Sequence, residues 1–111
     1  MSKEFYPALT LSMAISGEVQ AHRFVGTDNA VCGAGENSLG VTDTYGKDEV
    51  TAVTVLGAMP VETGAAVTAG GLVESDASGR AIDNSTGTAV ARALQSATAA
   101  GQFVQCILIP N

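Results

Sequence analysis

The sequence predicts an all-β protein, a small β-sandwich or β-barrel of about 8–10 short strands. Apolar stretches recur at intervals of about 8–12 residues, and clusters of Gly, Asp, Asn and Ser separate them. No segment keeps the 3.6-residue period of a helix for long enough to build a strand–helix–strand unit. The Ala-rich segment 95–101 could form at most one short helix, because Gly101 is suited to end a helical turn.

Individual strands follow from the alternation of apolar residues with small or polar ones. Leu9 to Ile15 alternates regularly and predicts a half-buried strand, and Val19 to Val25 predicts a second strand with a less decisive face. Val50 to Met59 is the strongest β segment in the first half of the chain. Phe103 to Ile109 should form the last strand and should stop at Pro110, because proline has no N–H to give to a ladder.

Two stretches of the chain resemble each other. Ser38 to Gly57 and Thr88 to Ile109 both open on a small residue and Val, pass through small or polar residues, and end in an apolar strand. A shorter strand and a turn precede each of them, at Phe24 to Cys32 and at Leu72 to Ile82. The pattern predicts two similar β units packed on each other. A true duplication and a chance likeness both explain it.

Length and composition predict one β domain over residues 9–111, preceded by an extended N-terminal arm over residues 1–8. A chain of 111 residues is too short for two independent cores. Pro7 biases the residue before it toward extended backbone. Hydrophobic residues make up 46% of the chain and charged residues only 14%, so much of the surface must be Ser, Thr, Gly and Ala. Such a surface suits close packing against another protein.

The charge balance argues against two classes of partner. The net charge is −6, and the five basic residues are scattered, so the chain has no basic stripe to hold a phosphate backbone. We therefore expect no direct contact with nucleic acid. We also expect no contact with a membrane, because no stretch approaches the roughly 20 apolar residues of a membrane-spanning helix.

The residues that usually carry chemistry are sparse, and we expect no enzyme, no metal and no cofactor. His22 is the only histidine, no G-x-S-x-G motif is present, and Cys32 and Cys106 lie inside apolar segments, as buried free thiols would. The glycine-rich loop Gly33 to Gly40 is followed by a strand-like sequence and not by the helix that a phosphate site needs. The acids of Asp43 to Glu49 lack the spacing of a calcium loop.

Four segments carry a resemblance to a known family. They are G-V-T-D (Gly40 to Asp43), G-A-M-P-V-E (Gly57 to Glu62), A-V-T-A-G-G-L-V-E-S-D-A-S-G-R-A-I (Ala66 to Ile82) and the closing stretch from Gly87 to Pro110. Together they resemble the capsid cement, or head decoration, proteins of tailed bacteriophages. The resemblance covers roughly two-thirds of the chain, from about Val41 to Ile109. The first forty residues match that family less well.

The resemblance implies a β-rich structural protein made in the cytoplasm of a bacterial host and carried on the outer surface of the virion. Its partners would be the major capsid protein and itself, as a homotrimer, with a dimer as the alternative. It would bind the expanded head and clamp adjacent capsid subunits against the pressure of the genome. We place the capsid grip in the arm, at Lys3, Glu4, Phe5, Tyr6 and Pro7, because exposed aromatic residues are enriched in interface cores. The alternative function is a noncatalytic ligand- or carbohydrate-binding module.

Overall fold

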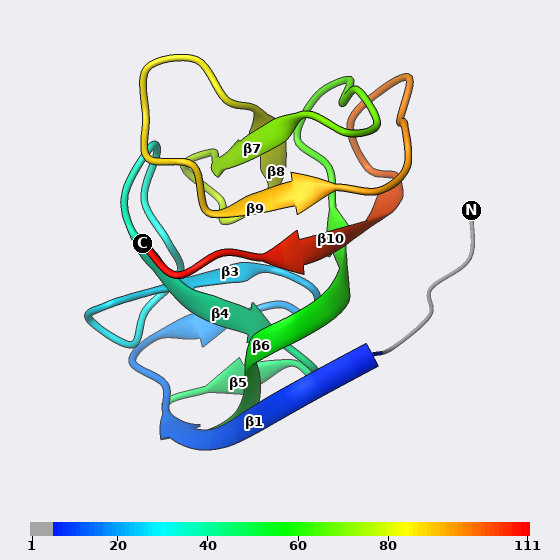
Figure 1. Ribbon diagram of the computed structural model, residues 1–111. Coiled ribbons are helices and arrows are strands. Elements are labelled where there is room, and N and C mark those ends of the chain that lie inside the picture. Colours follow the sequence, from blue (N-terminus) through cyan, green and yellow to red (C-terminus); the bar gives the residue numbers. More distant parts are fainter. Residues whose placement is uncertain (1–5) are drawn as a thin grey trace.

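The computed structural model describes residues 6–111 and confirms an all-β fold. These residues form ten strands and no helix (Figure 1). The segment 95–101, the one expected place for a helix, forms turns and an isolated bridge between Ala97 and Val67. Within residues 6–111 there is no helix of the length and apolar character that crossing a membrane requires. The strands are β1 (Tyr6–Ala14), β2 (Glu18–Val19), β3 (Phe24–Gly26), β4 (Ser38–Thr42), β5 (Gly46–Lys47), β6 (Val50–Glu62), β7 (Leu72–Ser75), β8 (Ala81–Asp83), β9 (Ala91–Ala93) and β10 (Phe103–Leu108).

Eight strands form one antiparallel sheet that curls into a nearly closed barrel. Its order is β3-β4-β6-β10-β9-β7-β8, with β1 added on β6, and β2 pairs with β5 in a small separate sheet. A bridge between Thr63 and Ala81 connects the chain just beyond β6 to β8 at the far end of that order. This contact brings β8 next to the end of β6, so that the strands β6, β10, β9, β7 and β8 nearly close on themselves (Figure 1).

The two similar stretches of sequence occupy equivalent places in the sheet. The first stretch forms β4 and β6, and the second forms β9 and β10, and in each case the two strands pair antiparallel. The shorter preceding strands, β3 and β7, lie beside β4 and β9. The order β3-β4-β6 is therefore mirrored by β10-β9-β7, and the two halves meet where β6 pairs with β10.

Strand β6 is shared by both halves and changes partner near a glycine. Its first part pairs with β1 and β4, and its last five residues, Ala58 to Glu62, pair with β10. Gly57 has a φ of 109°. A Cβ atom there would collide with the carbonyl oxygen of Tyr6 and the amide nitrogen of Ala8. Only glycine fits this conformation and this close approach of β1.

The core joins residues from both halves of the chain. The main cluster contains Phe24, Cys32 and Val41 from the first half together with residues such as Val73 and Val104 from the second half. A smaller cluster under β1 consists of Ile15, Val19, Val25 and Val53. Phe24 is the largest fully buried side chain. Burial of this apolar surface is what holds the two similar halves together.

The prediction of one continuous strand from Val19 to Val25 is wrong, because the strand is interrupted in its middle. The chain leaves β2 after Val19 and turns at His22, which has a φ of 62°, before β3 begins. The turn allows Arg23 to reach across the molecule, where its Nη2 lies 3.1 Å from Oε1 of Glu62. Arg80 lies beside the same carboxylate, 3.9 Å from it. These contacts tie the start of β3 to the end of β6 and to the β7–β8 hairpin.

Candidate interaction surface

Five strands each contribute one residue to a continuous row across the outside of the sheet, which we call the outer row. Directly opposed residues of antiparallel strands share a face, and the register places each member opposite the next. In order along the row, the members are Tyr6 on β1, Ala58 on β6, Ile107 on β10, Arg92 on β9 and Leu72 on β7. In Figure 1 the strands β7, β9, β10, β6 and β1 follow one another across the side turned toward the viewer.

The local sequence explains why the outer row faces solvent. In β9, Arg92 is exposed while its neighbours Ala91 and Ala93 are fully buried. In β10, Ile107 is 46% exposed while Cys106 is fully buried. Successive side chains of a strand point to opposite faces, so burying the small or apolar neighbours forces the remaining residue outward. The outer row thus combines Tyr6, Ile107 and Leu72, which are large and mainly apolar, with one alanine and one charged residue.

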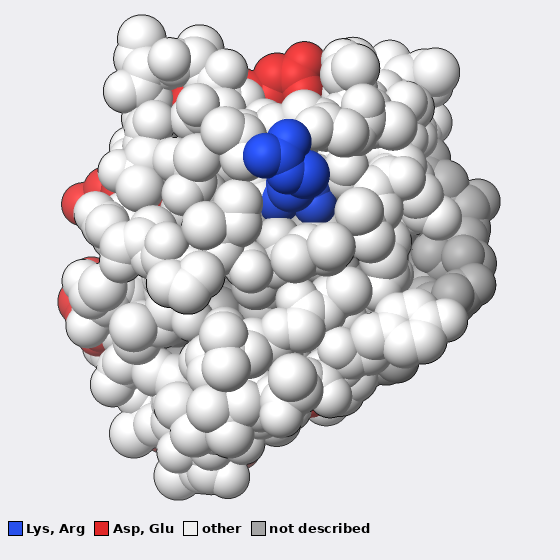
Figure 2. Space-filling view, viewed as in Figure 1, with Lys and Arg blue, Asp and Glu red and all other residues white. Residues whose placement is uncertain are grey.

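The face that carries the outer row is nearly uncharged. Figure 2 shows one small basic area amid a broad white surface, and the visible acidic groups lie toward its margins. Arg92 is the only charged member of the row, and its Nη1 donates a hydrogen bond to the carbonyl of Gly70 at 2.7 Å. Within residues 6–111, no carboxylate lies within ion-pair distance of Arg92. Contiguous exposed apolar surface of this kind is typical of sites of protein association.

Strand β1 adds an open edge to this surface. It is nine residues long, has no charged residue, and all but Met13 of its residues are exposed. In the part of the chain that the structure describes, β6 is its only pairing partner. Edge strands are normally protected by charged residues, prolines, bulges or covering segments, and within β1 the protection consists of Pro7 and the register shifts around Leu9. The strand is therefore suited to pair with a strand from another protein.

The predicted capsid grip falls partly on this edge. Tyr6 and Pro7 begin β1, where they lie opposite Ala58 and Gly57, and Tyr6 is 60% exposed. Lys3, Glu4 and Phe5 lie outside the described residues. The structure thus connects the grip to the outer row through Tyr6, which belongs to both.

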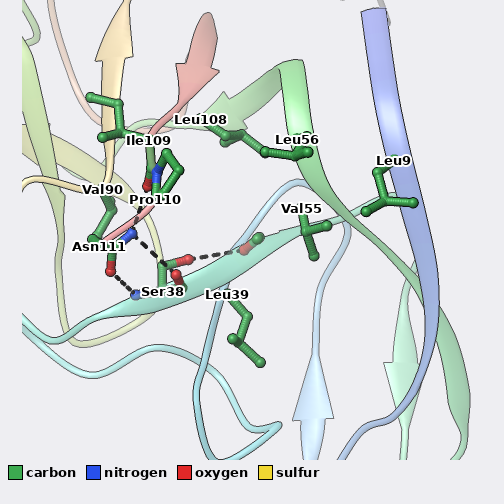
Figure 3. A pocket seen from close by; sticks show the side chains of 11 residues that line it. Leu9, Ser38, Leu39, Val55, Leu56, Val90, Leu108, Ile109, Pro110 and Asn111 are labelled. Carbon is green, nitrogen blue, oxygen red and sulfur yellow. Dashed lines mark hydrogen bonds between the residues drawn. The ribbon is translucent and has the colours of Figure 1, made fainter.

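An apolar groove of about 300 Å³ lies between β1, β4, β6 and the C-terminal residues (Figure 3). Its apolar lining includes Leu9, Leu39, Val55, Leu56, Leu108 and Pro110. Its polar groups bond to one another: Ser38 N–H donates to Oδ1 of Asn111 at 2.9 Å, and Nδ2 of Asn111 donates to the Ser38 carbonyl at 3.2 Å. A small-molecule site normally aims polar groups at its ligand. This groove instead extends the apolar surface beside β1.

A second hollow of about 440 Å³ is polar and lies between two loops. Asp28 and Glu36 contribute its carboxylates. Within residues 6–111, no three side chains of the types that bind metals gather at one place. Two acids alone do not make a cation site there.

His22, Cys32 and Cys106 are of the residue types best suited to catalysis. His22 packs its ring against the edge of Phe103, with ring centroids 5.5 Å apart. Cys32 and Cys106 are buried free thiols. Burial raises the pKa of the Cys106 thiol to about 12, and burial is also the main cause of a raised pKa at Cys32. A nucleophilic cysteine needs the opposite shift, because the thiolate is the reactive form.

Comparison with known proteins settles the family. The family model described as phage cement protein matches residues 4–108, which is nearly the whole chain. This chain belongs to the phage cement protein family. Among solved structures, the N base of the head fiber protein gp8.5 of bacteriophage phi29 has a similar fold, with a TM-score of 0.74 and 20% identity over 91% of this chain and 95% of that chain. No curated protein matches the chain.

Membership makes the protein a structural component of a phage capsid that associates with capsid proteins. The sequence resemblance stated above is therefore confirmed. As a phage cement protein, it belongs to a family whose work is structural and in general not enzymatic. A nearly uncharged outer face with an open strand edge is suited to such a role.

The sequence did not single out the outer row. Val90, Arg92 and Leu94 follow one another at a spacing of two residues, but Val90 is buried whereas Arg92 and Leu94 are exposed. The signal that could have found Arg92 is its position between two alanines, since a charged residue flanked by small apolar ones in a strand should face solvent. Nothing local shows that Ile107 and Leu72 lie on either side of it.

Proposed function

We propose that this phage cement protein binds the outer surface of the expanded head and clamps adjacent major capsid protein subunits against the internal pressure of the genome. The observation that carries the proposal is the family match over residues 4–108. It is supported by a face with almost no charge and by the open edge of β1. Both features suit a broad and closely fitting contact with a protein lattice.

The clamp works by mass action. A protein that binds only the expanded lattice stabilises it by RT ln(1 + [L]/Kd), about 2.7 kcal/mol per site at a concentration of 100 Kd. Each copy that touches two subunits must be released before those subunits can separate. Because many copies cover one head, the effect on the whole shell is large.

The grip in this proposal is the N-terminal arm, at Lys3, Glu4, Phe5, Tyr6 and Pro7. Full burial of a large side chain such as Phe5 or Tyr6 contributes about 1.5–3 kcal/mol. Its last two residues, Tyr6 and Pro7, begin β1, whose free edge can accept a strand from a capsid subunit or extend a capsid sheet. We also propose that the protein acts as a homotrimer, with a dimer as the alternative, on the outside of the virion.

Deletion of residues 2–7 tests the grip. The remainder of β1 still pairs with β6 from Leu9 onward, so the fold should persist and can be checked by circular dichroism. In co-sedimentation with expanded heads that lack the cement protein, the deletion should abolish binding. Tyr6→Ala should weaken binding, whereas Tyr45→Ala, at another exposed tyrosine, should not. Undiminished binding by the truncated protein would refute the role of the arm.

The clamp itself is tested by heating heads with and without the bound protein. Saturating protein should raise the temperature at which expanded, DNA-filled heads rupture. Unexpanded shells should bind much less of it, because the proposed site spans subunits in their expanded arrangement. An unchanged rupture temperature at full occupancy would show that the protein decorates the head without clamping it.

A further inference from the structure

We propose that the outer row is a docking surface for the capsid shell, and that its partner is an apolar surface of a shell subunit presenting a carboxylate to Arg92. This inference rests on the proposed function and names the contact surface and its partner chemistry. It differs from the arm grip because it assigns the sheet face itself, from Tyr6 to Leu72, to the interface.

The first argument is continuity. The register sets Leu72 beside Arg92, Arg92 beside Ile107, and Ile107 beside Ala58. Three members are substantially exposed and apolar: Tyr6 at 60%, Ile107 at 46% and Leu72 at 36%. The row spans five strands without an interruption by an acidic residue, so it offers one contiguous surface and not scattered apolar side chains.

The second argument is the charge at its centre. A guanidinium has five N–H donors in a planar fork, and the hydrogen bond to the Gly70 carbonyl uses one of them. Arg92 has no acidic partner within residues 6–111, unlike Arg23 and Arg80, which both pair with Glu62. Arginine and tyrosine are the residues that most often dominate binding energy at the centre of an interface. A partner carboxylate would bind the fork in two-point geometry.

The third argument selects the shell over a contact of the row with itself. Such a contact, around a twofold or a threefold axis, would bring the Arg92 side chains of the copies together, and like charges facing each other oppose association. Finally, Tyr6 belongs both to the row and to the arm proposed to hold the shell.

The test compares charge reversals at two exposed basic residues. Arg92→Glu and Lys47→Glu change the net charge equally, but Lys47 lies on β5, outside the outer row. In titrations with expanded heads that lack the cement protein, Arg92→Glu should weaken binding by at least about 30-fold, as at an interface hot spot. Lys47→Glu should change the affinity for these heads by less than about threefold. Ile107→Asp should weaken binding as Arg92→Glu does.

Folding and assembly are checked on the same samples. Thermal unfolding should stay near that of the wild type, because Arg92 and Ile107 are exposed. If Arg92→Glu does not fold, Arg92→Gln, which keeps N–H donors and loses the charge, decides the question and should weaken binding by about tenfold. Light scattering should give the same mass for variants and wild type.

Three outcomes would overturn the inference. Wild-type affinity in folded Arg92→Glu and Ile107→Asp would exclude the row while leaving the clamp proposal standing. A loss of oligomers in the variants, together with lost binding, would assign the row to a contact between copies. Absence of head binding by the wild type would refute the proposed function itself, and with it this inference.

Discussion

Phe24 should be the most costly single truncation in the core. It is the largest fully buried side chain and belongs to the main cluster, which joins both halves of the chain. Truncating a buried Phe to Ala costs about 3–5 kcal/mol, from lost transfer free energy and from the cavity left behind. The unfolding entropy of 111 residues, at about 2.1 cal/mol/K per residue, is about 0.23 kcal/mol/K. The Tm of Phe24→Ala should therefore fall by about 13–21 °C.

Urea unfolding followed by circular dichroism measures this cost, provided that the slope with denaturant stays the same. Phe103→Ala is the matched control, because it removes the same atoms from a half-buried ring packed against His22. Phe103→Ala should lower the free energy of unfolding clearly less than Phe24→Ala does. Equal losses at the two positions, or a loss below about 1 kcal/mol at Phe24, would show that the core is not packed around Phe24 as described.

Two further predictions concern titratable groups. Hydrogen bonds to the carboxylate of Glu74, led by the one from the Ser85 N–H, lower the pKa of this group. The charged carboxylate therefore stabilises the fold at neutral pH. This stabilisation is lost as the pH falls through the lowered pKa. Glu74→Gln should accordingly lower Tm at pH 7, and the difference from wild type, followed by calorimetry, should shrink as the solution is acidified; a constant difference would contradict this. Cys32 and Cys106 should resist an aromatic disulfide reagent at pH 8 until guanidinium unfolds the chain, because burial raises both pKa values. Rapid labelling of either thiol in the folded protein would contradict the described burial.

Much of the fold was predictable because strands leave a local signal. Val50 to Met59 and Phe103 to Ile109 were expected as strands, and they lie in β6 and β10 almost as expected. The likeness between the two stretches also predicted two equivalent pairs of strands. The errors arose where tertiary contacts override the local pattern, as at His22, where a backbone turn interrupts an alternating segment.

By itself, the sequence determined which segments form strands, where turns separate them, and that few charges would reach the surface, because these follow from side-chain alternation and composition along the chain. Only the tertiary structure decided which strands are neighbours and in what register. That choice aligns Tyr6, Ile107 and Arg92 on one face, although 86 residues separate Tyr6 from Arg92 in the chain. A shift of one residue in any pairing would turn the exposed side chains of that strand into the core. Packing of the whole barrel, and not local propensity, therefore fixes which side chains share the exposed face.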